Sequence, residues 1–234
     1  TERFPGVSST ACLKVFDLNV GRSGLSAQQA GALGLAIETT AVSAPDKPHY
    51  YPGAKPVVLK LVAERGTRRL LGIQGVGLGE VVKRIDVAIA AMAGRLTVDD
   101  LAHLDLAYAP PYSEAMDVLI HAANALRNKL DGFMRGISAL QLKEALDAGD
   151  DIMLLDVRTP DEHDAGHIPG STLIPLGAVA GRVNEVPRDK RVVAYCKTSL
   201  RAYEACRILA GNGLEHVEVL EGGFLAWPYE AETG

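Results

Sequence analysis

The sequence has few cysteines, few aromatic residues and no long apolar run. Its three cysteines, Cys12, Cys196 and Cys206, are spread over 234 residues. A sparse, odd count indicates free thiols in a reducing compartment rather than a disulfide framework. The longest apolar run, 87–93, is far shorter than the roughly 20 residues that span a bilayer. Residues 1–20 lack the basic head and apolar stretch of a secretory signal. We therefore expect a cytoplasmic protein that does not enter a membrane.

Positive charge is also scarce. The net charge is −5, and Lys and Arg are scattered, with no basic block beyond the pair at 68–69. This distribution argues against a nucleic-acid partner. Hydrophobic residues make up 47% and charged residues 23%, a globular composition long enough for one large or two modest domains. Because the chain begins with Thr1 rather than Met, we expect it to be a piece of a longer protein.

The first half, residues 1–132, mixes strand-like and helix-like patterns and predicts an α+β domain. Strands are expected at 13–20, 35–42, 57–63 and 69–76, with a turn at the glycines 21 and 24 and a hairpin at 65–67. Helical spacing predicts helices at 26–33, 79–94 and 114–129. Ser26, Thr97 and Ser113 are the expected caps, and Thr97 forms a capping box with Asp100.

The second half, residues 136–234, predicts an α/β domain after a short linker. Ser138 is expected to cap a helix at 139–148, and a second helix is expected at 200–210. Apolar strands are predicted at 151–157, 191–195 and 217–220, and the glycine pair 222–223 opens a last helix. Strands that alternate with helices imply a parallel sheet with helices on both faces.

The loop after the strand at 191–195 carries the strongest chemical signal. Cys196 follows the strand directly, and Arg201 comes five residues later, where a helix begins. Cys196 is therefore expected at the C-terminal edge of a parallel sheet, where such folds bind ligands. The helix N-terminus carries about half a positive charge and free N–H groups. With Lys197 and Arg201 nearby, these groups favour a nucleophilic thiolate.

The same N–H groups would stabilise the anionic terminal sulfur of a persulfide or bind an oxyanionic sulfur donor. A lone cysteine is more often a small buried hydrophobic residue. The arginine and the helix start favour the functional interpretation for Cys196. Cys206 falls in mid-helix and Cys12 at a strand start, so both are interpreted as ordinary structural cysteines.

Three ordered motifs in the second half resemble the rhodanese family. The segment 154–158 (LLDVR), Glu162 and 166–171 (GHIPGS) resemble its first signature, and 220–227 (LEGGFLAW) resembles its closing one. The Cys196 loop lies between them, and the resemblance covers about residues 136–229. It implies transfer of sulfane sulfur through a persulfide on Cys196.

The resemblance also implies roles for the neighbours of Cys196. Arg201 would complete the catalytic pair, and the intervening loop residues would bind the persulfide: Lys197, Thr198, Ser199 and Leu200. Asp156 and Arg158 would support the loop, although an ordinary ion pair at a strand end explains them equally. His167 is interpreted as a structural turn residue. The loop encloses six residues from Cys196 to Arg201, one fewer than in related phosphatases and arsenate reductases, which favours sulfur over phosphate.

The first half resembles the dimerisation domain of FAD-dependent pyridine nucleotide-disulfide reductases. The matching segments are 13–16 (LKVF), 50–53 (YYPG), 70–74 (LLGIQ) and 105–113 (DLAYAPPYS). Within that family the resemblance is greatest to the coenzyme A-disulfide reductases, some of which carry a C-terminal rhodanese domain. It implies a homodimer in which Tyr50 and Tyr108 reach the active site of the partner subunit. Both tyrosines could equally be amphipathic interface residues.

Full-length members of this fusion use FAD, NAD(P)H and coenzyme A. The present chain contains no Gly-x-Gly-x-x-Gly after a strand, and the glycine-rich stretch 72–79 lacks the full fingerprint. The family's flavin-side redox cysteine would lie before Thr1. The chain as given is therefore expected to bind neither flavin nor nicotinamide, and no metal site is predicted.

Three hypotheses follow. The first is a sulfurtransferase module that passes sulfane sulfur from a donor to a small thiol such as coenzyme A or glutathione. In this hypothesis the chain is the C-terminal part of an FAD- and NAD(P)H-dependent CoA-disulfide, persulfide or polysulfide reductase. The second is a non-catalytic dimerisation module with a regulatory or thiol-sensing cysteine. The third, a phosphatase, is disfavoured by the short loop.

Overall fold

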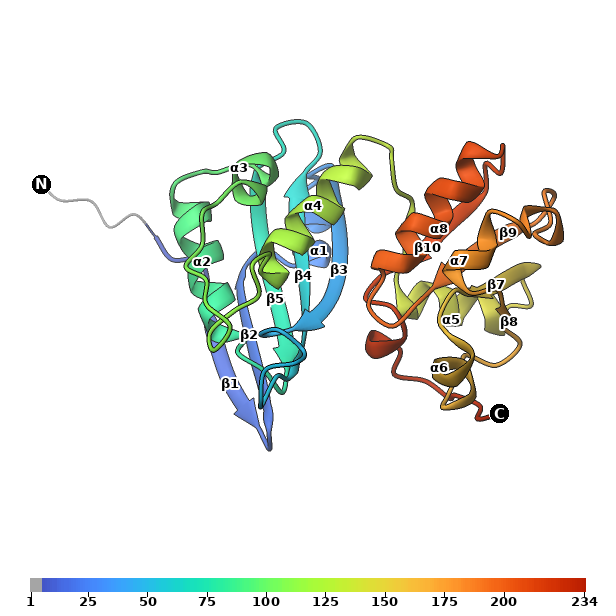
Figure 1. Cartoon of the computed structure of the whole chain (residues 1–234). Coiled ribbons are helices and arrows are strands. Elements are labelled where there is room, and N and C mark those ends of the chain that lie inside the picture. Colours follow the sequence, from blue (N-terminus) through green and yellow to red (C-terminus); the bar gives the residue numbers. More distant parts are fainter. Residues whose placement is uncertain (1–5) are drawn as a thin grey trace, which may run out of the picture. The chain divides into compact units, whose positions relative to one another are not determined.

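The computed structural model describes residues 6–234. The chain divides into two compact units, Thr1–Leu130 and Asp131–Gly234 (Figure 1). Each unit has its own sheet and its own buried core. Within the described range, no helix is both long and apolar enough to cross a membrane.

The first unit is an antiparallel sheet with helices, as the α+β prediction requires. Its strands occur in the order β1-β2-β5-β4-β3, and each adjacent pair is antiparallel. The elements are β1 (Ala11–Val15), β2 (Leu18–Gly24), α1 (Ala27–Ala32), β3 (Ile37–Pro45), β4 (Pro56–Glu64), β5 (Leu70–Gly77), α2 (Val82–Ala93), α3 (Val98–Ala102) and α4 (Val118–Leu130).

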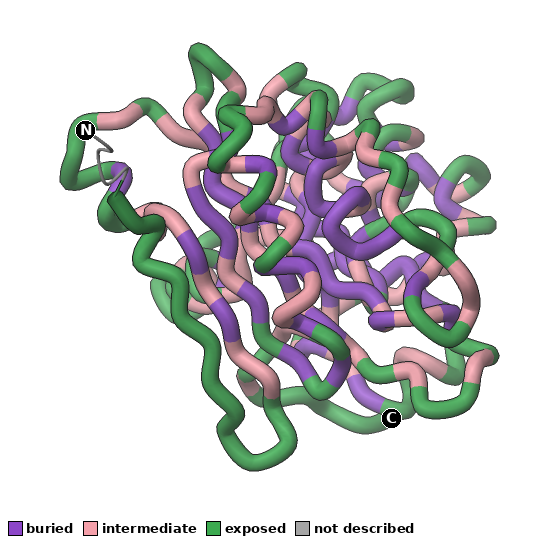
Figure 2. Tube along the Cα trace, turned by 90° about the vertical axis from the view of Figure 1, so that its left-hand side faces the viewer, coloured by how far each residue is buried: buried purple, intermediate pink, exposed green. Residues whose placement is uncertain are grey.

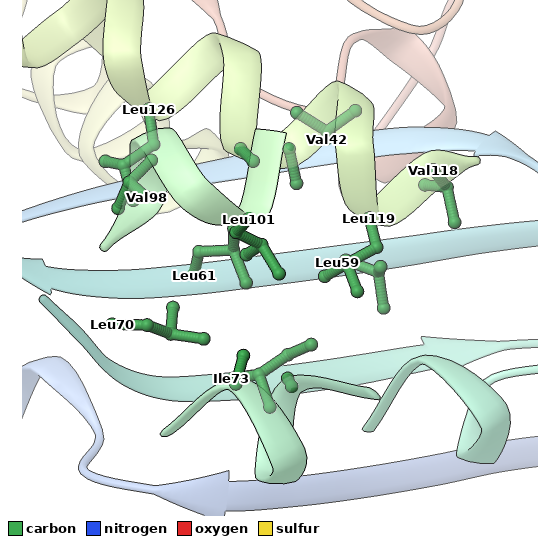
Figure 3. Packing of buried hydrophobic residues seen from close by; sticks show 14 of the residues in the cluster. Val42, Leu59, Leu61, Leu70, Ile73, Val98, Leu101, Val118, Leu119 and Leu126 are labelled. Carbon is green, nitrogen blue, oxygen red and sulfur yellow. The ribbon is translucent and has the colours of Figure 1, made fainter. Parts of the chain in front are cut away.

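One continuous cluster forms the core of this unit. Strand residues such as Leu59, Leu61 and Ile73 pack against Leu101 and Leu119 of the helices (Figure 3). The strand side chains alternate, so that one face of the sheet is covered by α2, α3 and α4. Burial of these aliphatic side chains supplies the main stabilisation of the unit.

The first predicted strand is wrong in extent. Residues 13–20 form two strands, β1 and β2, joined by a two-residue turn at Phe16 and Asp17, with Phe16 at a φ of 51°. Gly21 and Gly24 lie inside β2 rather than in a turn. Every residue of β1 is exposed (Figure 2). Cys12, interpreted from sequence as an ordinary structural cysteine, is therefore exposed on an edge strand.

The predicted start of the long helix is also wrong. Ser113 does not cap it, because α4 begins at Val118. The Ser113 hydroxyl donates to Asp117 at 2.7 Å, and Asp117 accepts the N–H of Leu119 at 2.9 Å. Asp117 is thus the residue that caps the helix. The buried Arg84 holds Asp117 in this capping position, because its guanidinium donates to the same carboxylate at 2.7 Å.

The second unit is a parallel five-stranded sheet with helices, in the order β6-β10-β9-β7-β8. Two of its strands, β6 and β8, are too short for the sequence pattern to show. The elements are β6 (Gly136–Ile137), α5 (Ala139–Asp147), β7 (Ile152–Asp156), α6 (Pro160–Asp164), β8 (Thr172–Leu173), α7 (Leu176–Val179), η1 (Val183–Glu185), β9 (Arg191–Tyr195), α8 (Leu200–Gly211), β10 (Val217–Leu220) and η2 (Phe224–Ala226).

Two separate clusters bury the two faces of this sheet. Val192 and Ala194 of β9 belong to the cluster that includes α7 and α8. Val193 and Tyr195, which alternate with them, belong to the cluster that includes Leu142 of α5. The predicted last helix is a single 3-10 turn, η2, because the glycine pair before it has positive φ and only three residues continue the turn.

Candidate active site

Cys196 lies at the end of β9, one step before the turn that leads into α8. The residue is only 1% exposed. The backbone N–H of Ser199 donates to its Sγ at 3.2 Å. A sulfur that accepts an amide hydrogen bond at a helix N-terminus is held where negative charge is favoured. The predicted position at the C-terminal edge of the parallel sheet therefore agrees with the structure.

The turn between β9 and α8 has an unusual backbone. Ser199 is in the left-handed region, with φ 100° and ψ −27°. Such a conformation costs a non-glycine residue about 1–3 kcal/mol and occurs often at functional sites. The Ser199 hydroxyl donates to the carbonyl of Leu220 at 3.3 Å, which helps to hold the turn. The strain places the Ser199 N–H against the sulfur.

Residues 223–225, near the end of the second unit, also contact this turn. The N–H of Phe224 donates to the Cys196 carbonyl at 2.8 Å, and the N–H of Leu225 donates to the Lys197 carbonyl at 3.0 Å. Gly223 permits this approach, because a Cβ there would lie 2.6 Å from the Cys196 carbonyl oxygen. The 220–225 segment therefore holds the Cys196 loop through two main-chain hydrogen bonds and through the Ser199 hydroxyl.

Arg201 lies beside Cys196 and is paired with a carboxylate. Its guanidinium donates to both oxygens of Glu162, at 2.7 and 2.8 Å. The hydrogen bond to Glu162 is the main reason why the pKa of Arg201 is raised, against the effect of burial, and Cys196 adds to the rise. The same pairing lowers the pKa of Glu162 to about 2. Both groups are therefore ionised across the physiological range.

Asp156 and Arg158 form a buried ion pair at the end of β7, the strand next to β9. The Arg158 guanidinium donates to Asp156 at 2.6 and 2.9 Å. Burial would raise the pKa of Asp156, but the hydrogen bonds from Arg158 and His163 outweigh it and lower the pKa. Arg158 also lies 4.4 Å from the ring centroid of Phe224, the residue whose N–H holds the Cys196 carbonyl. The pair thus supports the loop indirectly.

Tyr195 links the loop to the 166–171 segment. Its hydroxyl accepts the N–H of Ile168 at 3.2 Å and donates to Ser171 at 2.9 Å. Burial raises its pKa to about 12, so it stays a neutral phenol. His167, expected to be structural, exchanges backbone hydrogen bonds with Glu232, and its ring stacks on His163 at 3.9 Å.

The remaining loop residues differ in exposure. Lys197 and Leu200 are exposed, Thr198 is intermediate, and Ser199 is buried. The loop and Arg201 thus lie next to Cys196, and the Asp156–Arg158 pair lies at the end of the neighbouring strand. Of the two predicted cations, Arg201 interacts with Cys196, whereas Lys197 is exposed. Cys206 lies in mid-helix on α8, 6% exposed, in agreement with its structural interpretation.

Tyr50 and Tyr108 belong to the first unit and lie on two of its loops. Their exposed fractions are 69% and 49%. Arg84, itself buried, donates to the Asp46 carbonyl at 2.8 Å and to Asp117 at 2.7 Å. It therefore ties the loop after β3, which carries Tyr50, to the segment before α4, which carries Tyr108.

The glycine-rich stretch 72–79 does not fit a dinucleotide. Gly72, Gly75 and Gly77 lie inside β5 and allow close strand packing, because a Cβ at Gly77 would lie 2.4 Å from the Pro56 carbonyl oxygen. Among the described residues, this stretch therefore offers no phosphate-binding turn for a flavin or nicotinamide cofactor. Over the same described range, no group of three or more His, Cys, Asp or Glu residues could hold a metal ion.

Sequence reasoning missed Glu162 as part of the site. The sequence assigned Glu162 only to the rhodanese-like signature and gave it no role at the site. A local signal was present, because Thr159 and Glu162 have the spacing of a capping box, and the structure contains that box. The structure also adds Gly223 and Phe224, which meet the loop from more than twenty residues along the chain. It adds Tyr195 as well, which directly precedes Cys196 and binds the distant Ile168 through its hydroxyl.

Comparisons with known proteins agree with both halves. Residues 138–230 match the rhodanese-like domain, and residues 10–120 match the pyridine nucleotide-disulphide oxidoreductase dimerisation domain. The structure of an NAD-dependent persulfide reductase from A. fulgidus is 44% identical, with a TM-score of 0.88 over 98% of this chain and 40% of that one.

Two curated relatives point the same way. The NAD(P)H sulfur oxidoreductase (CoA-dependent) of Pyrococcus furiosus is 43% identical over 124 residues, 53% of this chain and 28% of that protein. A sulfurtransferase of Allochromatium vinosum is 37% identical over 91 residues, 39% of this chain and 85% of the relative. The chain spans less than half the length of the two reductases.

These matches support an enzyme of sulfur metabolism with a persulfide-related function. They agree with the fold of each unit and with the order of the two domains along the chain. The chain belongs to the pyridine nucleotide-disulfide oxidoreductase family, as a fusion of its dimerisation domain with a rhodanese-like domain.

Proposed function

We propose that the second unit transfers sulfane sulfur and that Cys196 carries the sulfur as a persulfide. The observation that carries this proposal is the hydrogen bond from the Ser199 N–H to the Cys196 sulfur, at the N-terminus of α8. A thiolate and a persulfide anion are both stabilised by hydrogen-bond donors next to the sulfur. Arg201, on the first turn of the same helix, interacts with the sulfur through its guanidinium, whose charge is paired with Glu162.

The transfer has two steps. The Cys196 thiolate attacks the outer sulfur of a donor, for example thiosulfate, and a new S–S bond forms while the S–S bond of the donor breaks. Sulfite leaves with the bonding electron pair, so that one thiolate and one dianion become one persulfide anion and one dianion. An acceptor thiolate then attacks the terminal sulfur of the protonated persulfide, which gives the acceptor persulfide and the Cys196 thiolate again.

Each neighbour has a defined task in this proposal. The loop Lys197, Thr198, Ser199 and Leu200 surrounds the terminal sulfur, and its amides stabilise negative charge there. Asp156 and Arg158 keep the loop in place through Phe224 and Tyr195. Cys206 takes no part, because burial raises its pKa to about 12.

We also propose that this chain is the C-terminal part of a flavin- and NAD(P)H-dependent reductase of CoA disulfides, persulfides or polysulfides. The resemblance to longer reductases, of which it covers 40% or less, supports this proposal. In a homodimer built by the first unit, Tyr50 and Tyr108 would reach the active site of the partner subunit. Their exposure and their shared anchor at Arg84 support such a role. The small thiol acceptor would be coenzyme A or glutathione.

A labelling experiment tests the sulfur transfer. The chain is incubated with thiosulfate, persulfides are trapped with an alkylating reagent, and the modified peptide is identified by mass spectrometry. We expect label on Cys196, and none in Cys196→Ser. Cys206→Ser is the matched control, because it removes a thiol from the same core cluster and should leave thiocyanate production from thiosulfate and cyanide unchanged.

Two other functions are outcomes of the same test. If Cys196→Ser leaves thiocyanate production unchanged, the sulfurtransferase hypothesis fails. The chain is then a non-catalytic module, in which the first unit serves dimerisation and the second carries a regulatory or thiol-sensing cysteine. If an aryl phosphate is hydrolysed with loss of activity in Cys196→Ser, the loop acts as a phosphatase. The short loop from Cys196 to Arg201 disfavours that second outcome.

A further inference from the structure

Glu162 and Arg201 form an ion pair next to Cys196, because Arg201 interacts with both residues. Arg201 is the guanidinium beside the sulfur, and both of its outer nitrogens already donate to Glu162. The pairing is bidentate, which is the geometry that an arginine would otherwise use for the oxyanion of a substrate. The positive charge at this place is therefore balanced before any donor arrives.

Glu162 is fixed in this position rather than a mobile surface group. The Thr159 N–H donates to its carboxylate at 3.1 Å, and the Glu162 N–H donates back to the Thr159 hydroxyl at 3.3 Å. This capping box starts α6, directly after the turn that holds the buried Asp156–Arg158 pair. With a pKa of about 2, the carboxylate remains ionised at every pH at which the protein would work.

Sulfur donors differ in the charge they bring close to the reacting sulfur. Thiosulfate is a dianion whose sulfonate lies one bond from the transferred sulfur, so it needs a free cation. The persulfide of an organic thiol carries at most one negative charge at its sulfurs, and its remaining charges lie further away. A neutralised arginine and a fixed carboxylate disfavour the first donor far more than the second.

We propose that Glu162 is a specificity-determining residue, which makes the Cys196 site select sulfane sulfur from organic persulfides over thiosulfate. This inference rests on the proposed sulfur transfer and names its substrate class. With such a donor, the Cys196 thiolate attacks the terminal sulfur of the protonated persulfide, the S–S bond of the donor breaks, and the donor thiol leaves as a thiolate. Glu162 accepts hydrogen bonds from both terminal nitrogens of Arg201, so that these nitrogens are not available to a sulfonate. Its own negative charge also repels an incoming dianion.

The test measures persulfide formation on Cys196 in a single turnover, with thiosulfate and with glutathione persulfide as separate donors. Glu162→Gln removes the charge but keeps the capping box, which accepts Gln as well as Glu. We expect the second-order rate constant for thiosulfate to rise about tenfold, which is the lower range for one unit charge at a partly exposed site. The constant for glutathione persulfide should change less than about threefold. In the wild type, glutathione persulfide should be the faster donor.

A double variant separates the two contributions of Glu162. If the freed guanidinium binds the sulfonate, Glu162→Gln combined with Arg201→Met should lose the gain for thiosulfate. The gain in the single variant should also shrink at high ionic strength, because screening weakens a partly exposed charge. Glu185→Gln is the matched control, since Glu185 also forms a bidentate ion pair, with the exposed Arg182, and it should change neither rate constant.

The outcomes are distinguishable. If Glu162→Gln leaves the ratio of the two rate constants unchanged while both donors still load Cys196, the inference on Glu162 is wrong and the sulfur transfer stands. A wild type that prefers thiosulfate also overturns it. If neither donor loads Cys196, the proposed function fails and the inference fails with it. Thermal unfolding of Glu162→Gln close to that of the wild type shows that a changed ratio does not come from a damaged fold.

Discussion

Replacement of Arg158 by methionine is expected to destabilise the second unit by about 3–5 kcal/mol, the usual cost of removing one member of a buried ion pair. The partner, Asp156, has no exposed surface and would lose the donors that hold its charge. Two donors remain, the backbone N–H of residue 158 and the His163 ring. The loss should therefore be near 3 kcal/mol rather than 5. Methionine keeps an apolar stem in the space beside Phe224.

Urea unfolding followed by tryptophan fluorescence measures this loss, because the single tryptophan, Trp227, is partly buried and packs against a core cluster of the second unit. Combining Arg158→Met with Asp156→Asn removes both charges, and we expect it to recover at least half of the lost stability. Arg182→Met, at an exposed pair, is the control and should change little. A loss below about 1 kcal/mol in Arg158→Met, or no recovery in the double variant, would refute the reasoning.

The pH dependence of the same unit follows from the sign of the Asp156 shift. Burial raises the pKa of Asp156, but Arg158 and His163 lower it further, so the net pKa lies below that of the unfolded chain, about 3.9. The stabilisation is therefore complete above about pH 4 and is lost as the pH falls through the folded-state pKa. In the double variant this acid-dependent loss from position 156 should be absent.

Three further predictions concern other parts of the chain. Because burial raises the pKa of Cys206 to about 12, iodoacetamide at pH 8 should label the exposed Cys12 and leave Cys206 unmodified in peptide maps of the folded protein; equal labelling would contradict this. Gly223→Ala should abolish persulfide loading, because its Cβ would lie 2.6 Å from the Cys196 carbonyl oxygen, whereas Gly170→Ala, with no atom within 4 Å, should keep the loading and lose only some stability. Arg84→Met should destabilise the first unit by about 3–5 kcal/mol in thermal unfolding followed by circular dichroism, and Asp117→Asn should restore part of it; an unchanged transition would show that the buried pair is dispensable.

The fold was predictable from sequence where the signal is local. The predicted N-caps at Ser26, Thr97 and Ser138 are present, because each needs only residues three positions apart. The β1–β2 hairpin was missed, since its Phe16–Asp17 turn contains no glycine. Ser113 and Asp117 are both good caps in isolation, and only Arg84, more than thirty residues earlier, decides between them.

The candidate site shows the same division. Cys196, Arg201 and the intervening loop were predictable because a strand, a nucleophile and a helix start follow one another within a few residues. The pairing of Arg201 with Glu162 was not, because the two residues are 39 positions apart and meet only after the sheet has formed. The hydrogen bond from Phe224 to the Cys196 carbonyl is equally invisible in a local pattern.

Burial alone does not decide which cysteine of the second unit is the nucleophile. Cys196 and Cys206 belong to the same core cluster and are both nearly inaccessible. Their electrostatic surroundings are opposite, however. The Cys196 sulfur accepts an amide N–H and lies beside Arg201, so a negative charge on it has partners. The Cys206 thiol instead donates to the Glu218 carbonyl, and burial together with the Glu218 carboxylate opposes its ionisation. These two thiols therefore have different chemistry, because Cys196, just before the N-terminus of α8, has hydrogen-bond donors for an anion, whereas Cys206, inside the helix, faces a carbonyl.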